Sequence, residues 1–233
     1  MSTARDDVLA RVRAALGRPG AGGTTAEVAR DVEVPRAYRT AGSHATGSRE
    51  VLDLLVDRLV DYRAHVRRVP GAEVPGALAE ILSPAGRGLD AAGERTVVVP
   101  AGLDRSWLTG LATDVVLVDD SRDAPRSAAE LDAASAVVTA ARLAIAETGT
   151  IVLDGEPDQG RRAISLVPDV HVCVVRADQV VETVPEAVRL LGAHPERPLT
   201  WISGPSATSD IELDRVEGVH GPRTLHVLLV TAS

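Results

Sequence analysis

The chain has 233 residues and a mass of 24.3 kDa, enough for one large domain or two small ones, and its 45% apolar content suits a globular protein with a sizeable core. All 25 basic residues are Arg, and the absence of Lys excludes a Walker A phosphate loop, a pyridoxal phosphate Schiff base and a catalytic lysine. The formal net charge of −8 and the pI near 5.3 argue against a nucleic-acid or anionic-membrane surface.

Residues 1–45 are predicted to form an N-terminal arm rather than a domain. A helix is expected between Ala4 and Leu16, with an apolar face made by Val8, Leu9, Val12 and Leu16. The glycine- and proline-rich stretch 17–23 then breaks this helix. The N-terminal residues lack the apolar region of a secretory signal, and no apolar run approaches membrane-spanning length. We therefore expect a cytoplasmic protein.

Residues 46–233 are predicted to form one domain in which amphipathic segments alternate with continuous apolar runs. Helices are expected over Ser48–His65 with Ser48 as the N-cap, over Val74–Leu82, near Trp107, from Ser127, over Arg161–Leu166 and over Pro185–Leu191. Strands are expected over Val66–Val69, Thr96–Val99, Val115–Val118, around Ala144, and over Thr150–Leu153, Val170–Val175, Leu199–Ser203 and Thr224–Val230. Continuous apolar runs are typical of strands covered on both faces, so the predicted fold class is α/β, a three-layer α/β/α domain with a mostly parallel sheet.

The chain contains one cysteine, Cys173. A single cysteine excludes an intramolecular disulfide and any all-cysteine iron–sulphur or zinc site within the chain. Its neighbours, Val-His-Val-Cys-Val-Val, form a buried-strand pattern, which favours an inert core thiol.

Three polar, glycine-containing segments lie at the ends of the predicted strands, where ligands of open α/β sheets bind. The first is Glu147-Thr148-Gly149-Thr150, in which a carboxylate, two hydroxyls and a glycine separate two strand-like stretches. This segment is either a backbone approached closely by a ligand or a tight turn that needs a positive φ at Gly149, and the sequence leaves both interpretations open.

The second segment leads into the strand that carries His171. An imidazole in an apolar strand needs a hydrogen-bond partner, and a structural histidine is favoured over a catalytic base. Arg161 and Arg162 precede this strand and are able to meet an anionic ligand, although paired arginines on a helix usually form a solvated face.

The third segment comprises residues 203–212 and the turn 218–222. Hydroxyls at a helix start after a strand form an anion pocket, because free backbone N–H groups and the helix dipole favour a carboxylate or a phosphate. Ser209 and Glu212 are explained by a capping box alone. The substrate-binding candidates are Thr148, Gly149, Thr150, Ser203, Gly204, Ser206, Thr208 and Asp210.

The catalytic candidates are Glu147, His171 and His220, the last of which lies between two glycines of the turn 218–222. We expect the three segments to converge at one end of the sheet, because each lies at a strand terminus. No two of the candidate histidines have the spacing of a local ligand pair, so no metal site is predicted. The Gly-x-Ser-x-Gly and Gly-x-Gly-x-x-Gly motifs are missing, and we expect no cofactor.

Four motifs resemble the LUD-domain family, in particular its lactate-utilisation members: Ala144–Leu153, Gly160–His171, Ile202–Glu212 and Gly218–Pro222. The opening helix and the predicted helix that contains Leu55 and Tyr62 are similar to the N-terminal part of that family. The resemblance implies a fold similar to the NagB/RpiA/CoA-transferase-like α/β/α architecture. It also implies a role in the oxidation of L-lactate to pyruvate, together with a cysteine-rich protein and an iron–sulphur protein.

Two hypotheses of function follow from the resemblance. In the first, the chain is a non-redox subunit of a lactate-oxidising assembly, with an organising surface or a carboxylate-binding pocket. In the second, it is an enzyme that acts alone on an acyl or phosphorylated small molecule, as its fold relatives do. Glu147 resembles the loop glutamate that CoA transferases use as a nucleophile, and this analogy rests on the fold and one short motif.

Overall fold

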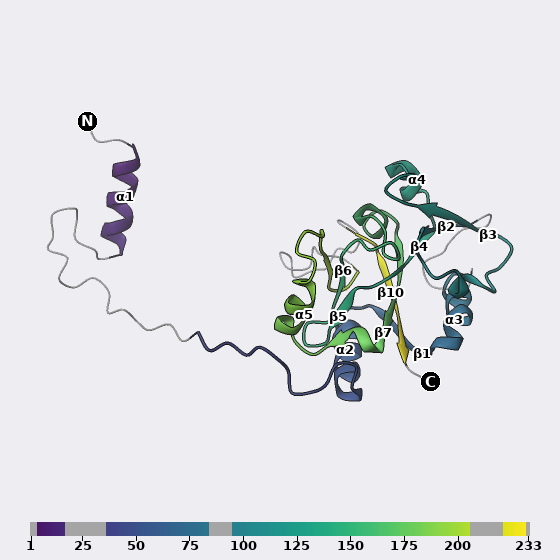
Figure 1. Cartoon of the computed structure of the whole chain (residues 1–233). Coiled ribbons are helices and arrows are strands. Elements are labelled where there is room, and N and C mark those ends of the chain that lie inside the picture. The colour runs from purple at the N-terminus through teal and green to yellow at the C-terminus, as the bar shows by residue number, and fades with distance from the viewer. Residues whose placement is uncertain (1–3, 17–35, 84–94, 206–220, 232–233) are drawn as a thin grey trace. The chain divides into compact units, whose positions relative to one another are not determined.

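The computed structural model describes residues 4–16, 36–83, 95–205 and 221–231 (Figure 1). The chain divides into two compact units, Met1–Tyr38 and Arg39–Ser233. In the first unit, helix α1 (Ala4–Ala15) confirms the helix predicted near the N-terminus, and Val8 and Val12 on its apolar face are exposed. None of the described helices combines the length and the hydropathy needed to cross a membrane.

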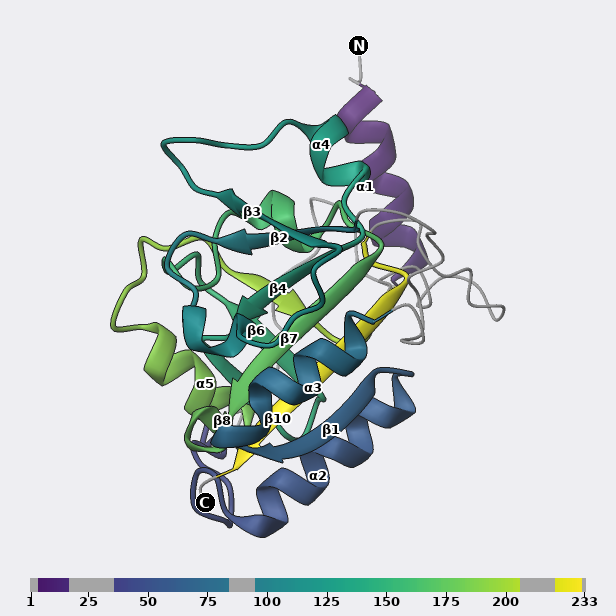
Figure 2. The same cartoon turned by 90° about the vertical axis from the view of Figure 1, so that its right-hand side faces the viewer.

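The second unit is built on a six-stranded sheet in the order β1-β10-β7-β4-β2-β3, in which every neighbouring pair is parallel (Figure 2). Its strands are β1 (His65–Pro70), β2 (Arg95–Pro100), β3 (Val115–Asp120), β4 (Ala136–Ala140), β7 (Val170–Arg176) and β10 (Thr224–Thr231). The predicted α/β class with a mostly parallel sheet is therefore confirmed.

Helices cover both faces of the six-stranded sheet. Helix α3 (Val74–Ile81) and the 3₁₀ helix η2 (Arg105–Leu108) pack on one face, against side chains that include Leu228. Helix α2 (Arg49–Asp61) packs on the other face with Val227, the neighbour of Leu228 in β10. Successive side chains of a strand point to opposite faces, so α2 and α3 lie on opposite sides of β1 and β10, as both views show (Figures 1 and 2).

A second, four-stranded sheet has the order β8-β5-β6-β9. It consists of β5 (Leu143–Ile145), β6 (Thr150–Leu153), β8 (Val180–Val181) and β9 (Thr200–Ile202). Ala144 and Ile151 on one of its faces share the core of α2, and helix α5 (Val184–Leu191) packs on the other face. A single sheet was expected from the sequence, and the second sheet corrects that expectation. Strands of two to four residues carry too short a pattern for their partners to be assigned.

Two of the expected helices are shorter in the structure than the sequence predicts. The helix predicted over Ser48–His65 begins at the predicted cap, where Ser48 accepts from the Val51 N–H, and ends at Asp61 because Arg63 has a left-handed φ of 65°. The segment expected as a helix over Arg161–Leu166 is one 3₁₀ turn, η3 (Arg162–Ser165). The remaining short elements are η1 (Gly71–Glu73), α4 (Ala128–Asp132) and η4 (Ala177–Gln179).

Two strands of the larger sheet also differ from expectation. Strand β4 was not predicted, because its Ala-rich residues follow α4 without a break in apolar character. Strand β3 was expected to be covered on both faces, whereas it is the edge strand and Leu117 is exposed.

Candidate functional site

The turn between β5 and β6 carries the first predicted segment, Glu147–Thr150. Gly149 has a φ of 58°, and a Cβ on it would lie 2.8 Å from the Arg58 Cβ and 3.1 Å from the Arg58 carbonyl carbon. The glycine is therefore required twice, by a left-handed backbone and by close contact with α2. The sequence left open a tight turn with a positive φ at Gly149, and this turn is observed. The backbone of α2 lies in close contact with it.

Three hydroxyls form a hydrogen-bonded chain across the edge of the small sheet. Thr148 Oγ1 lies 2.8 Å from Thr150 Oγ1, which lies 2.8 Å from Ser203 Oγ. The pairing of β6 with β9 places Ile151 beside Ile202, so Thr150 and Ser203 lie opposite each other. Thr150, in the middle of the chain of hydroxyls, is buried, whereas Thr148 at one end is partly buried and Ser203 at the other end is exposed. Each hydroxyl both donates and accepts, and the exposed end can bind an oxygen-bearing ligand.

Helix α2 positions both segments of this hydroxyl chain. A Cβ on Gly204, which has a φ of 83°, would lie 2.9 Å from the carbonyl oxygen and from the Cβ of Tyr62, just as Gly149 lies against Arg58. Arg58 and Tyr62 are four residues apart and therefore share one helix face. Neither was among the predicted site residues, although the helix that contains Tyr62 was predicted.

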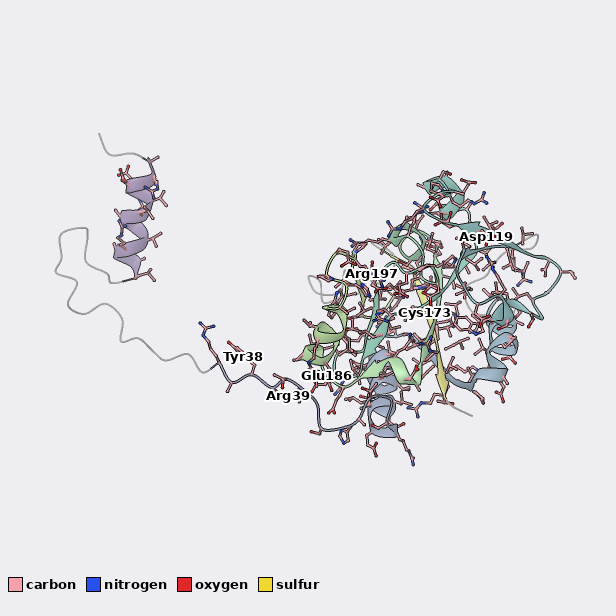
Figure 3. All side chains as sticks on the ribbon, viewed as in Figure 1. Tyr38, Arg39, Asp119, Cys173, Glu186 and Arg197 are labelled. Atoms are coloured by element: carbon pink, nitrogen blue, oxygen red, sulfur yellow. The ribbon has the colours of Figure 1, made fainter. Side chains whose placement is uncertain are left out.

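Glu147 forms an ion pair with Arg39, and its backbone N–H donates to the Glu182 carbonyl at 3.0 Å. The Glu147 side chain is 32% exposed, so its carboxylate is accessible from solvent beside the hydroxyl chain. Arg39 lies at the edge of the unit (Figure 3). Sequence reasoning missed Arg39 as a site residue, because 108 positions separate it from Glu147.

A second contact fixes the segment that follows Arg39. The buried Glu182 carboxylate accepts from the His44 backbone N–H at 2.6 Å, and this bond is the main reason why the pKa of Glu182 lies below its usual range. A Cβ on Gly42 would lie 2.2 Å from Glu182 Oε2, so only glycine fits there. The chain from Arg39 to Ser48 is thereby attached to the small sheet next to the turn.

His171 lies in β7, on the other sheet from Glu147 and Ser203, and is fully buried. Its Nε2 is 2.8 Å from Thr139 Oγ1, while Nδ1 has no hydrogen-bond partner among the residues that the structure describes. Burial lowers the pKa of His171 to about 4, so the imidazole is neutral near pH 7. No hydrogen bond within the described part of the chain links His171 to the hydroxyl chain, and the convergence of the three segments at one end of the sheet stays a prediction.

Cys173 is buried beside His171 on β7, as predicted from its apolar neighbours (Figure 3). Its thiol lies 3.7 Å from the Ala140 carbonyl, and burial raises its pKa to about 12. The thiol is therefore protonated and unreactive at neutral pH.

The remaining candidates, Ser206, Thr208, Asp210 and His220, lie outside the described residues. The two ends of that segment meet, since the Pro205 carbonyl oxygen is 3.5 Å from the place of a Cβ on Gly221. Among residues 4–16, 36–83, 95–205 and 221–231, no group of three His, Cys, Asp or Glu side chains is arranged to hold a metal ion.

The LUD domain family matches this chain over residues 54–230. The chain belongs to the LUD domain family. This match confirms the family assignment made from the four motifs, and it includes the β5–β6 turn, the hydroxyl chain and most of α2.

Relatives of this LUD domain protein carry a common name. "Lactate utilization protein C" of Deinococcus radiodurans is 53% identical over 184 residues, which are 78% of this chain and 80% of that protein. The protein of the same name from Anoxybacillus flavithermus is 28% identical over 188 residues, 78% of this chain and 81% of its own length. A solved structure, a DUF162 family protein from Deinococcus radiodurans, is 45% identical with a TM-score of 0.61, and the match covers 78% of this chain and 96% of that one.

Proposed function

We propose that this LUD domain protein is a component of an L-lactate utilisation system, which oxidises L-lactate to pyruvate in the cytoplasm. The observation that carries the proposal is the 53% identity, over four-fifths of its length, to a relative named Lactate utilization protein C. A relative from a second genus carries the same name at lower identity over a similar span.

Within this system the chain acts as a non-redox subunit. Oxidation of lactate to pyruvate releases two electrons, and iron–sulphur clusters that accept electrons are held by several cysteine thiolates. This chain has one cysteine, and its thiol is buried and protonated. The electrons therefore pass to partner proteins, a cysteine-rich protein and an iron–sulphur protein.

The hydroxyl chain gives this subunit a ligand-binding role. Thr148, Thr150 and Ser203 present hydroxyls next to the Glu147–Arg39 ion pair, an arrangement that suits a small carboxylate or phosphate. Held by the turn and by α2, these groups are preorganised for such a ligand.

The alternative function, a stand-alone enzyme, is supported by one observation, the partial exposure of Glu147. An accessible carboxylate on a rigid turn can attack the carbonyl carbon of an acyl thioester, forming an acyl anhydride and releasing the thiolate, as expected of a stand-alone enzyme of the CoA-transferase-like fold; the phosphosugar-isomerase-like alternative would act on a phosphorylated small molecule. Such an enzyme turns over its substrate as the purified chain alone, whereas the subunit needs its partners.

Gene deletion tests the proposed function. The deletion strain, with no second lactate dehydrogenase, is expected to grow poorly on L-lactate and normally on pyruvate, and the wild-type gene restores lactate growth. Anaerobic purification from lactate-grown cells is expected to recover cysteine-rich and iron–sulphur proteins with this chain. The chain purified alone is expected to be colourless, without stoichiometric iron or flavin. Normal lactate growth of the deletion strain contradicts the proposal.

A further inference from the structure

A cavity of about 200 Å³ opens at the carboxyl ends of β2 and β3, away from the residues of the predicted site. Ala101 follows β2, Asp120 ends β3 and is followed by Ser121 and Arg122, and the loop 155–161 after β6 closes the other side. In α/β folds, ligands bind outside the carboxyl ends of parallel strands. The position of this cavity is thus that of a binding site. It is lined by none of the predicted catalytic or substrate-binding candidates, but it is lined by Arg161, which the sequence indicated as able to meet an anionic ligand.

One wall of the cavity is a buried ion pair. Asp120, 1% exposed, accepts from Arg161 Nε at 2.9 Å and from Arg161 Nη2 at 2.5 Å, and it also accepts from the Arg126 backbone N–H at 2.9 Å. Arg161 Nη2 donates in addition to the Arg126 carbonyl at 3.1 Å. These bonds fix the guanidinium in place and leave its Nη1 without an acceptor in the described part of the chain. Two N–H donors of a rigid cation therefore remain for a ligand.

A second cation, Arg122, also lines the cavity. Across residues 4–16, 36–83, 95–205 and 221–231, no carboxylate forms an ion pair with Arg122. Its guanidinium lies against Gly155, where a Cβ would be 3.2 Å from Nη2. The other charges lining the cavity are paired, Arg161 with Asp120 and Glu156 with Arg197. Arg197 lies outside the lining and also pairs with Asp154, which has a second partner in Arg142. The site thus has one uncompensated positive charge, which matches a ligand with one negative charge.

The size and the remaining walls define the rest of the ligand. About 200 Å³ is below the roughly 300–1,000 Å³ of sites for drug-sized molecules, so the ligand is a small metabolite. Ala101, Pro157 and Gly160 supply apolar surface for a short alkyl group. The Ser121 hydroxyl accepts from the Ala124 N–H at 3.0 Å, so its own proton is available for a ligand oxygen.

We propose that this cavity binds a small monocarboxylate, of the class of 2-hydroxy and 2-oxo acids. Arg122 neutralises the carboxylate, Arg161 Nη1 and the Ser121 hydroxyl donate to its oxygens, and the apolar wall receives the alkyl end. The choice of this acid class rests on the proposed function, whereas the single charge and the small size rest on the cavity. A ligand held here is separate from any ligand of the Thr148–Thr150–Ser203 hydroxyl chain.

Calorimetric titration of the full chain tests the proposal. L-Lactate and pyruvate are expected to bind saturably at millimolar concentration or below, while lactamide, which has the shape of lactate without the charge, does not bind. Arg122→Gln is expected to weaken carboxylate binding at least tenfold. Arg105→Gln is the matched control, because Arg105 pairs with Asp119, the neighbour of Asp120 in β3, and neither Arg105 nor Asp119 lines the cavity. Its affinity is expected to stay within twofold of wild type.

Three results would overturn the proposal: no binding of either acid by the wild-type chain, equal affinity of the wild type and Arg122→Gln, or binding of inorganic phosphate with both acids excluded. The test is independent of the growth experiment. If the deletion strain grows normally on lactate while Arg122-dependent binding is measured, the proposed function fails and the site stands. If lactate growth depends on the gene but no acid binds, the site fails and the proposed function stands.

Discussion

Gly149 and Arg58 lie so close that a single added carbon at Gly149 would come within 2.8 Å of the Arg58 Cβ. The contact joins the β5–β6 turn to α2, two elements that are about 90 residues apart in the sequence and that together hold the hydroxyl chain. Because the neighbouring Arg58 atoms belong to the backbone as well as to the Cβ, the helix cannot yield by rotating a side chain.

Gly149→Ala is therefore expected to destabilise the protein by about 2–4 kcal/mol, the sum of a left-handed backbone penalty and overpacking. The free energy of unfolding in urea measures this change. Gly110→Ala is the matched control, because Gly110 has a φ of 86° but nothing within 4 Å of its added Cβ. We expect it to cost about 1–2 kcal/mol, from the backbone alone. Equal losses in both variants would show that the contact with α2 contributes nothing.

Glu147→Gln separates the two candidate functions. The substitution preserves the shape of the side chain and removes the charge that pairs with Arg39. If Glu147 stabilises the turn, we expect a small loss of stability and normal growth on L-lactate, which is the outcome favoured here. If Glu147 is a nucleophile, the rate falls by several orders of magnitude and lactate growth stops. The measurement is lactate-dependent growth, with the soluble protein level as its control.

Five of the six strands of the larger sheet were predictable from the sequence because their signal is local, and β4 is the exception. Continuous apolar runs such as Val170–Val175 indicate a buried strand without knowledge of any partner. The small sheet was not predictable as a separate sheet, since β8 has two residues and β5 has three. Its assignment depends on pairings such as Ile151 with Ile202, which the sequence pattern does not encode.

The candidate site was predictable in part for the same reason. The glycine and hydroxyls at 148–150 and at 203–204 were evident from residue type, and the structure brings these two segments together. Arg39 was missed, because an exposed arginine has the same sequence pattern whether it pairs with a distant glutamate or with water. Arg58 was missed because it contacts Gly149 through its Cβ and backbone, which every residue type other than glycine possesses. The cavity beside Arg122 also went unpredicted, since an unpaired charge is recognisable only once the partners of its neighbours are known.

His171 is expected to make stability depend on pH. Its pKa is about 4 in the folded protein, whereas an exposed histidine has a pKa of 6.5, so between these values the unfolded state binds more protons. Stability from the neutral imidazole is complete above about pH 6.5 and is lost as the pH falls toward 4, by up to about 3 kcal/mol. Unfolding free energies between about pH 4 and pH 7 measure this slope.

The His171→Gln variant is expected to flatten that slope, because glutamine does not titrate and can still bond to Thr139. His194→Gln is the matched control, because it makes the same exchange at an exposed histidine. A wild-type slope in His171→Gln would assign the acid sensitivity to the carboxylates instead.

Two adjacent aspartates of β3 differ in burial and should differ in their contribution to stability. The Asp120 side chain is fully buried and pairs with Arg161, whereas Asp119 is 62% exposed and pairs with Arg105. Asp120→Asn leaves Arg161 without its counter-charge, and we expect a loss of about 2–3 kcal/mol, below the value for fully buried pairs because Arg161 is partly exposed. Asp119→Asn is expected to cost at most about 1 kcal/mol.

The double variant Asp120→Asn, Arg161→Gln should be more stable than additive losses predict, because it removes the unpaired cation as well. Urea unfolding of the wild type, Asp120→Asn, Arg161→Gln and the double variant completes the cycle, and strict additivity would show that the Asp120–Arg161 bonds do not couple the two side chains.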